Sequence, residues 1–279
     1  MKKCLFFYLY ISNDFESNIS TRLHKLLLSK YINLFDEANF VVAIDDYADL
    51  NKIKLGFKFI NSVTTNYTKK ITTRITINDK SICEVKMLLE DVFPVLMAKE
   101  SNNNDEAIFF AHNKGLTNVT NQFLNVESVL RWIICLYYYS FEFLEELDVK
   151  FKNGQALFGP LKTKFHNKFL PHTDISNHEF NYPGAFYWIN KNEVLNNLSF
   201  EIPVILNRIN RFLAEDFPFF VNENSVDGHN NYHTINTVAD LYHTDSFAWK
   251  KYLENYEQSD DFSCYEFQNL ILDKLINNH

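Results

Sequence analysis

The sequence predicts an α/β protein in which helices flank a mostly parallel central sheet. Three apolar runs support this prediction: CLFFYLYI at 4–11, NFVVAIDD at 39–46 and AIFFAH at 107–112. Strands that are buried on both faces, as in parallel sheets, have continuous apolar sequences rather than alternating ones. Because helical patterns separate the runs, strand–helix–strand units are the simplest connection between them.

Two of the intervening segments have the spacing of helices. In the segment 17–35, leucine recurs at helical spacing, and Ser20 is a candidate N-cap. In the segment 82–99, apolar residues return at positions that form one helical face, and Pro94 is expected to adjust the helix locally. Both segments lie between apolar runs, as crossover helices of a parallel sheet would.

The remaining elements are less regular. Two alternating segments, KFINSV at 58–63 and TTRITIN at 72–78, are expected to form short strands. A long helix is expected over 126–147, and two further helices near the C-terminus, at 246–258 and 264–276. We therefore expect a C-terminal helical extension on the sheet domain.

Composition and charge exclude several classes of protein. The chain has 279 residues, of which 46% are hydrophobic, so it can bury a core without disulfides or metals. The net charge is −8 and no basic stripe is present, so nucleic acid is not an expected partner. The four cysteines form no CxxC pair, which indicates free thiols in a reducing compartment.

The N-terminal segment MKKCLFFYLYISNDFES has two lysines and a short apolar run. The run is followed by polar residues rather than by a small-residue cleavage site, so a first strand is expected instead of a signal peptide. No segment approaches the roughly 20 apolar residues of a membrane span. We therefore expect a cytoplasmic location.

Polar side chains follow two of the predicted strands. Asp45 and Asp46 end the second run, and His112, Lys114 and Gly115 follow the third. Ligands of open α/β sheets bind outside the carboxyl ends of strands. Lysine can neutralise a phosphate, imidazole can donate to a phosphate oxygen, and glycine permits close backbone approach. The alternative is that both groups are ordinary solvated turns.

Two later segments contain further candidates. In RFLAEDF, Glu215 or Asp216 could deprotonate an acceptor hydroxyl, or could simply lie solvated at a helix end. In PGAFYWIN, Gly184 followed by Phe186 and Trp188 could form a stacking wall for a sugar ring, although such aromatic runs are most often core.

The histidines of the C-terminal part offer a metal-site alternative. His229 and His233 have the spacing of two zinc ligands on one helical face, with His243 further on. No glutamate follows the first histidine as it does in zincins, and the Asn-rich surroundings indicate a loop. A zinc-dependent hydrolase is therefore the weakest of the functional alternatives.

Five segments follow one another in an informative order: SICEVKMLLEDVF, FFAHNKG, LRWIICLYYY, GAFYWIN and RFLAEDF. In order and spacing they resemble a bacterial family of polysaccharide-biosynthesis glycosyltransferases with a GT-A-like fold. That family carries a YxHxKG motif at a strand end, a Trp-Arg helix with aromatic residues, a GNFWW segment and a late R-x-x-x-E motif, and SICEVKMLLEDVF resembles the helix before its motif strand. Arg131 and Trp132 stand in the opposite order, and Ala185 replaces the asparagine.

The resemblance implies a GT-A-like, Rossmann-like domain over 1–220, with a donor-binding half at 1–150 and an acceptor half at 151–220. The segment 221–279 would be the C-terminal loop and helical extension. It also implies a nucleotide-sugar donor that carries uridine diphosphate (UDP) and a surface-glycan acceptor such as capsule or lipopolysaccharide. Contact with the inner face of the membrane is an additional expectation.

The resemblance also assigns roles to residues. Lys114, with His112, would replace the divalent metal that Asp-x-Asp holds in other GT-A enzymes, so no metal site is expected. Asp45 and Asp46 would bind base and ribose, and Glu215 would be the general base. Three more residues complete the donor set that the resemblance implies: Glu84, Gly115 and Arg131. Manganese or magnesium is the disfavoured alternative.

A rival from another class is a transferase fold without catalysis that serves as a binding or assembly subunit. The altered motifs and the missing Asp-x-Asp favour this rival.

Overall fold

The structure is a computed structural model that describes residues 1–79, 81–98, 106–113, 126–160, 163–164, 180–181, 185–198, 214, 217–228 and 260–277. Within these ranges a seven-stranded sheet has the order β3-β2-β1-β4-β8-β5-β9. A separate two-stranded sheet joins β6 (Thr163–Lys164) to β7 (Phe180–Asn181).

The first four strands of the large sheet are parallel. They are β1 (Lys2–Tyr10), β2 (Glu37–Ile44), β3 (Lys70–Ile77) and β4 (Glu106–His112). All seven residues of β4 are buried, as expected for a strand with neighbours on both sides and cover on both faces. The predicted α/β class with a mostly parallel sheet is confirmed.

The other half of the sheet is mixed. Strand β8 (Tyr187–Asn190) is antiparallel to β4 and to β5 (Leu157–Gly159), and β9 (Val226–Gly228) is parallel to β5. Because β9 lies after residue 220, the sheet extends past the boundary that the sequence analysis places there.

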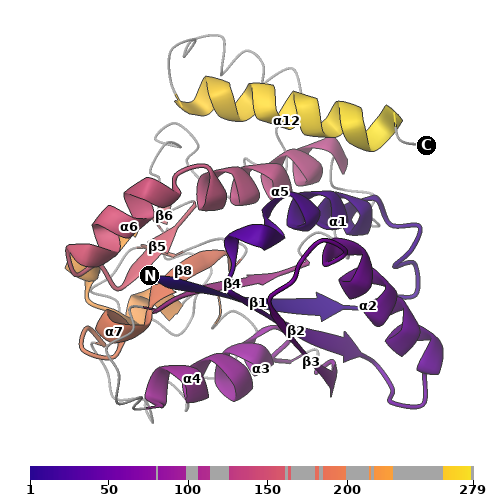
Figure 1. The fold of residues 1–279 in the computed structure, drawn as a ribbon, viewed down its shortest axis with the longest axis horizontal. Helices are drawn as coiled ribbons and strands as arrows, with labels where there is room; N and C mark the ends of the chain where they lie inside the picture. Colours follow the sequence, from indigo (N-terminus) through magenta and orange to yellow (C-terminus); the bar gives the residue numbers. More distant parts are fainter. Residues whose placement is uncertain are drawn as a thin grey trace.

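Helices cover the sheet on both faces (Figure 1). The helices α1 (Ile19–Tyr31), α2 (Leu50–Val63) and α5 (Val126–Phe141) lie on one face. On the other face lie α3 (Val85–Met87), a π-helical turn at Leu88–Val92, and α4 (Phe93–Met97). Pro94 lies in the first turn of α4, so the expected local adjustment near this proline is observed.

Alternate residues of β1 enter two separate hydrophobic cores. Leu5, Phe7 and Leu9 belong to the core beneath α1, α2 and α5. Phe6 and Tyr8 belong to the core that α3 and α4 cover. The alternation of side chains along a strand thus gives each face of the sheet its own apolar layer.

Three sequence-based expectations are corrected. The segment 58–63 is not a strand but the end of α2, because Phe59, Ile60 and Val63 lie on the buried side of a helix. The helix expected at 126–147 ends at Phe141, and α6 (Leu144–Lys152) follows with a different buried face.

The third correction concerns the start of α1. Its N-cap is Asn18 rather than Ser20, since the Asn18 side chain accepts a hydrogen bond from the Ser20 backbone N at 2.9 Å. Asparagine and serine are comparable N-cap residues, so composition alone did not separate them.

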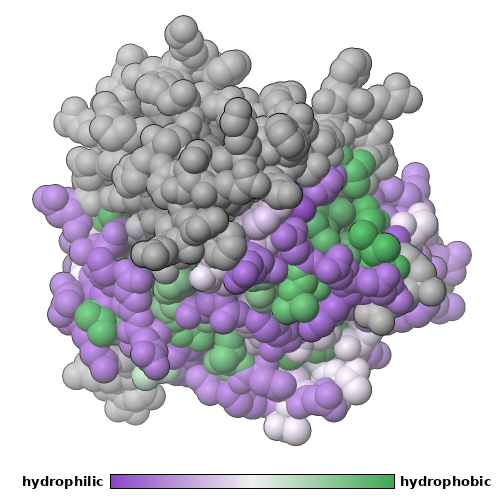
Figure 2. Space-filling model, turned by 90° about the horizontal axis from the view of Figure 1, so that it is seen from above, coloured by the Kyte–Doolittle hydropathy of each residue, from purple (hydrophilic) through white to green (hydrophobic). Residues whose placement is uncertain are grey.

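The C-terminal helix α12 (Asp260–Asn277) lies over α5 as an outer layer (Figure 1). Cys264, Ile271, Leu272 and Leu275 are buried there. The expected C-terminal helix at 264–276 is confirmed, whereas the helix expected at 246–258 lies outside the described residues. Viewed from this side, the coloured surface is largely hydrophilic, with hydrophobic residues in separate patches (Figure 2).

The remaining elements are short. They are the 3-10 turns Ile32–Leu34, Phe217–Phe220 and Glu223–Ser225, and α7 (Lys191–Val194). Among the described helices, none combines the length and the hydrophobicity that crossing a bilayer requires.

Candidate functional site

The carboxyl ends of β1 and β4 meet where the winding of the sheet changes direction. The connections from β1 through β3 pass over one face with α1 and α2, and the connection into β4 passes over the other with α3 and α4 (Figure 1). Such a switch point opens a crevice at the carboxyl edge, and ligands of doubly wound sheets bind there. We call this region, with its side chains at the ends of β1, β2 and β4, the switch-point edge.

Asn113 joins the ends of β1 and β4. Its side chain accepts a hydrogen bond from the Tyr10 backbone N at 2.9 Å and donates to the Tyr10 backbone O at 2.8 Å. Its own backbone N donates to the Tyr8 carbonyl at 3.1 Å. With 5% exposure, this side chain continues the ladder past the end of the strand. It therefore fixes the chain immediately before Lys114.

His112 lies beside Glu84 at this edge. The distance from His112 Nε2 to Glu84 Oε1 is 3.9 Å, and the two side chains are 10% and 14% exposed. The His112 ring also lies 6.0 Å from the Phe186 ring. The structure thus brings together Glu84 and His112, two residues that the sequence analysis assigns to the donor site. Glu84 follows Cys83, whose φ of 42° is rare outside glycine.

Asp45 lies just after β2, where Lys52, Tyr10 and Asn78 form hydrogen bonds to its carboxylate. Lys52 Nζ lies 2.7 Å from its Oδ2, and the Tyr10 hydroxyl donates to its Oδ1 at 3.2 Å. The hydrogen bond from Lys52 lowers the pKa of Asp45, and burial, with the Asp45 charge, raises the pKa of Tyr10 to about 12. The Asp45 side chain is 42% exposed. It is therefore a fixed carboxylate that a ligand can still reach.

Asp46 takes the alternative role of a turn residue. Its Oδ1 accepts a hydrogen bond from the Ala48 backbone N at 2.9 Å, and its backbone O accepts from the Asp49 N at 3.0 Å. This is the local pattern of an Asx turn. It leads into α2, where the Asp49 side chain accepts from the Lys52 N at 3.0 Å.

The prediction that Phe186 and Trp188 form an aromatic wall for a sugar is wrong. Both side chains have 0% exposure. Phe186 lies 5.4 Å from the Tyr137 ring. Trp188 stacks on Phe35 at 5.7 Å and donates from Nε1 to the Ser140 carbonyl at 2.9 Å. Neither ring offers a face to a sugar, because both fill the core beneath α5.

Arg131 also lies in packing rather than at a diphosphate site. It is 6% exposed on α5, and its guanidinium donates to Glu127 at 2.8 Å, Gln268 at 3.1 Å and Asn269 at 3.0 Å. Gln268 and Asn269 belong to α12, so this arginine binds the C-terminal helix. Its predicted role in the donor site is corrected accordingly.

The other candidates fall outside the described residues. They are Lys114, Gly115, Gly184, Glu215 and Asp216, together with the histidines at 229, 233 and 243. Their assignments stay predictions. In the described part of the chain, no group of three or more His, Cys, Asp and Glu side chains has the arrangement of a metal site.

Sequence reasoning missed the supporting residues Lys52, Tyr10 and Asn78. The Tyr8 hydroxyl donates to Asn78 Oδ1 at 2.9 Å, so β1 is also linked to the segment after β3. The signal was available in part, because Asn78 and Asn113 both directly follow a strand. Because β1 to β4 are parallel, a polar residue directly after any of these strands lies at the switch-point edge.

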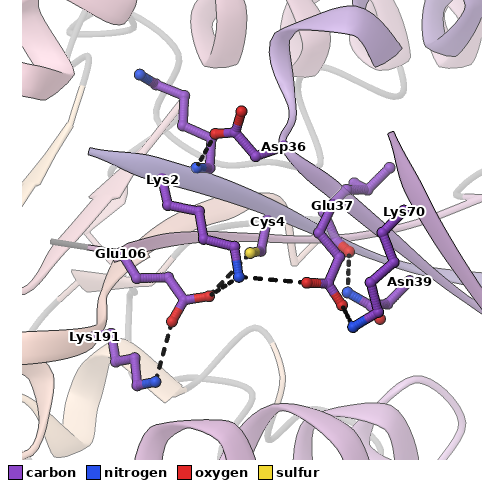
Figure 3. Close-up of polar contacts among 10 residues, drawn as sticks. Lys2, Cys4, Asp36, Glu37, Asn39, Lys70, Glu106 and Lys191 are labelled. Atoms are coloured by element: carbon purple, nitrogen blue, oxygen red, sulfur yellow. Dashed lines mark hydrogen bonds and ion pairs between the residues drawn. The ribbon is translucent and has the colours of Figure 1, made fainter. Parts of the chain in front are cut away.

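The opposite edge of the sheet contains a charged groove of about 520 Å³. Lys2 lies between Glu37 at 3.3 Å and Glu106 at 3.2 Å, and Lys191 contacts Glu106 at 3.0 Å (Figure 3). Lys70 pairs with Glu37 at 2.7 Å. Because these charges neutralise one another and connect β1, β2, β3, β4 and α7, the groove is a structural network rather than the preferred substrate site.

Comparison with known proteins adds no assignment. No protein-family model matches this chain, and a search of the curated proteins gives no match either.

Proposed function

We propose that this protein is a glycosyltransferase that moves a sugar from a nucleotide-sugar donor, of the UDP class, to a surface-glycan acceptor. The observation that supports it is the convergence of Asp45, Glu84, His112 and the clamp residue Asn113 at the switch-point edge. A nucleotide diphosphate needs hydrogen-bond acceptors for its sugar and base and donors or cations for its phosphates.

Asp45 suits the nucleoside end of the donor. Its carboxylate is 42% exposed, and Lys52 and Tyr10 fix its orientation. Ribose hydroxyls and the uracil N–H group are donors that a carboxylate accepts. Because Lys52 keeps the pKa of Asp45 low, the group is an anionic acceptor at neutral pH.

The diphosphate end belongs near the end of β4. An imidazole N–H group of His112 can donate to a phosphate oxygen, and Glu84 Oε1 lies 3.9 Å from His112 Nε2. Asn113 holds the backbone that leads directly into Lys114. In the proposal, the Lys114 ammonium neutralises the charge that develops on the leaving diphosphate, as a divalent metal does in other GT-A enzymes.

The reaction is a displacement at the anomeric carbon of the donor sugar. An acceptor hydroxyl oxygen forms the new bond to this carbon, and the bond to the diphosphate oxygen breaks with its electron pair. The hydroxyl proton passes to a carboxylate, for which the proposal retains Glu215 ahead of Asp216. This scheme assigns no role to Arg131, Phe186 or Trp188. The proposed location is cytoplasmic, at the inner face of the membrane when the acceptor is lipid-linked.

The second candidate is a transferase fold that binds without catalysis, as an assembly subunit. The burial of Phe186 and Trp188 and the packing of Arg131 against α12 favour it, because three expected contacts of an active transferase are absent from the site. The two candidates differ in turnover, not in fold.

Calorimetry with UDP and a panel of UDP-sugars, with a chelator present, tests the proposal. We expect wild-type protein to bind UDP, and Lys114→Ala to weaken binding by about 10-fold or more through loss of a charge-assisted contact. Lys25→Ala, which removes an exposed lysine of α1, should bind as wild type does. Absence of binding to every UDP compound would overturn the proposal.

Donor hydrolysis or transfer separates the two candidates. We expect Glu215→Gln to keep UDP affinity and to lower turnover by about 100-fold, the usual contribution of a general base. If the wild-type protein binds UDP-sugars without turnover, the second candidate, a non-catalytic assembly subunit, is favoured. If the chelator abolishes turnover and manganese restores it, a divalent metal rather than Lys114 neutralises the leaving diphosphate.

A further inference from the structure

Two cysteine thiols face each other between α5 and α12. Cys135 Sγ on α5 lies 3.5 Å from Cys264 Sγ on α12, although 129 positions separate the residues in the chain. Their exposures are 0% and 2%. Neither forms a disulfide in this structure. The pair therefore lies in the buried interface between the outer helix α12 and α5 beneath it, two helices that lie side by side in Figure 1.

Hydrogen bonds on either side of the thiols fix this contact. Gln268 lies one turn after Cys264 on α12, and its Nε2 donates to Cys135 Sγ at 2.7 Å. Arg131 lies one turn before Cys135 on α5, and it donates to Gln268 Oε1 at 3.1 Å. Residues four apart on a helix lie on the same face. Arg131 and Cys135 on α5 therefore face Gln268 and Cys264 on α12. The register between α5 and α12 is thereby set with the sulfur atoms opposite each other.

We propose that Cys135 and Cys264 form a reversible redox latch that locks α12 onto α5 when the thiols are oxidised. The co-reactant is a small-molecule disulfide. One cysteine thiolate attacks it and forms a mixed disulfide, and the other cysteine displaces the second thiol. The two protein thiols are oxidised to one disulfide, the small disulfide is reduced to two thiols, and the two cysteine protons end on those thiols.

The geometry requires little movement for this bond. The sulfur atoms must approach from 3.5 Å to the bonded distance of about 2.05 Å, which side-chain rotation and a small helix shift can supply. Burial raises the pKa of the Cys264 thiol well above its usual value, so the closed interface protects the pair. Exchange therefore proceeds when α12 separates transiently from α5, and the new bond then prevents further separation.

The other two cysteines provide internal comparisons. Cys83 is half-buried at the switch-point edge, and Cys4 is buried and donates to Glu106 Oε1 at 3.0 Å. Burial, together with that hydrogen bond, raises the pKa of Cys4 to about 12. We expect the half-buried Cys83 to form only a mixed disulfide with the reagent, Cys4 to stay reduced, and only Cys135 and Cys264 to form an internal disulfide.

Oxidised glutathione is the probe for the test on the full-length protein. After incubation, the remaining thiols are alkylated. Peptide mapping should then show an intramolecular Cys135–Cys264 disulfide in the monomer. The midpoint of thermal unfolding should rise by about 5 °C, because the bond closes a long loop. Dithiothreitol should reverse both changes. Cys135→Ser and Cys264→Ser should each lack the shift, and Cys83→Ser should keep it.

The wild-type protein alone can overturn the inference, even if a serine variant fails to fold. Addition of glutathione to Cys83 shows that the probe is active. If Cys135 and Cys264 then both stay reduced, including in urea below the main unfolding transition, the latch does not exist. A cross-link between any other pair of cysteines would contradict it equally. This inference does not depend on the proposed function.

Discussion

At the scale of single residues, the switch-point edge depends on side chains that continue the backbone ladder. Asn113 is the clearest case, because its amide replaces a strand residue opposite Tyr10. The amide is largely shielded from solvent, because Asn113 is only 5% exposed. The side chain of Asn113 therefore fixes the backbone at the carboxyl end of β4.

Replacement of Asn113 by alanine should therefore cost stability. Both Tyr10 backbone groups lose their side-chain partner, and we expect a loss of about 2–3 kcal/mol in the free energy of unfolding. Urea denaturation measures this change, with Asn51→Ala on the exposed side of α2 as the matched control. Equal stability of the two variants would show that the amide is not a structural clamp.

Residue identity also explains which site predictions failed. An aromatic run such as Phe186 to Trp188 has the same composition in a sugar-binding wall and in a core strand. The structure decides between the two, because β8 lies between β4 and β5 and its side chains are buried on both faces of the sheet. Likewise, Arg131 has one local partner, Glu127, but its two partners on α12 are 137 and 138 positions away, a separation that no local pattern reports.

At the scale of elements, α2 approaches β2 closely because of one glycine. A Cβ atom at Gly56 would lie 2.6 Å from Val42 Cγ1, well inside contact distance. The glycine is in the middle of α2, where it lowers helix propensity, so its presence reflects the packing of helix on sheet. The same segment shows why 58–63 was predicted wrongly, since six residues do not distinguish a buried helix end from a strand.

Gly56→Ala should destabilise the protein despite the better helix propensity of alanine. We expect a loss of about 1–3 kcal/mol from overpacking against Val42, measured by urea denaturation. Lys54→Ala, at an exposed position of the same helix, should change stability by less than about 0.5 kcal/mol. A Gly56→Ala protein more stable than the wild type would contradict the close approach.

At the scale of the whole molecule, the sequence predicted the parallel half of the sheet better than the mixed half. The apolar runs of β1, β2 and β4 are long and continuous because these strands are covered on both faces. Strands β5 and β9 have only three residues each and pair across about 70 positions. Such short strands carry no periodicity to read.

The charged groove, at the edge of the sheet opposite the switch-point edge, holds several elements together. We expect its carboxylates to determine how the free energy of unfolding falls at acid pH. Burial alone would raise the pKa of Glu106, but hydrogen bonds from Cys4 and Lys191 lower it below the ordinary 4.5. A carboxyl whose pKa is lower in the folded state contributes stability above its unfolded pKa and loses it as the pH falls through the folded value.

Glu106→Gln should remove this contribution. We expect a loss of about 3 kcal/mol at pH 7, because Lys191 is left without its buried partner. The variant should also lose less stability than the wild type does below about pH 4.5. Unfolding measured from pH 7 to pH 3 checks both expectations, with the exposed Glu16→Gln as control. Parallel wild-type and Glu106→Gln profiles would contradict the assignment.

The central claim is that a nucleotide diphosphate binds at the switch-point edge and not in the charged groove. Hydrogen exchange of the full-length protein with and without UDP, followed by mass spectrometry, tests it most directly. We predict slower exchange in peptides that contain 45–52, 78–84 and 112–118, and unchanged exchange in those that contain 36–39 and 70–74. Protection confined to the groove peptides, or no protection at saturating UDP, would contradict the account.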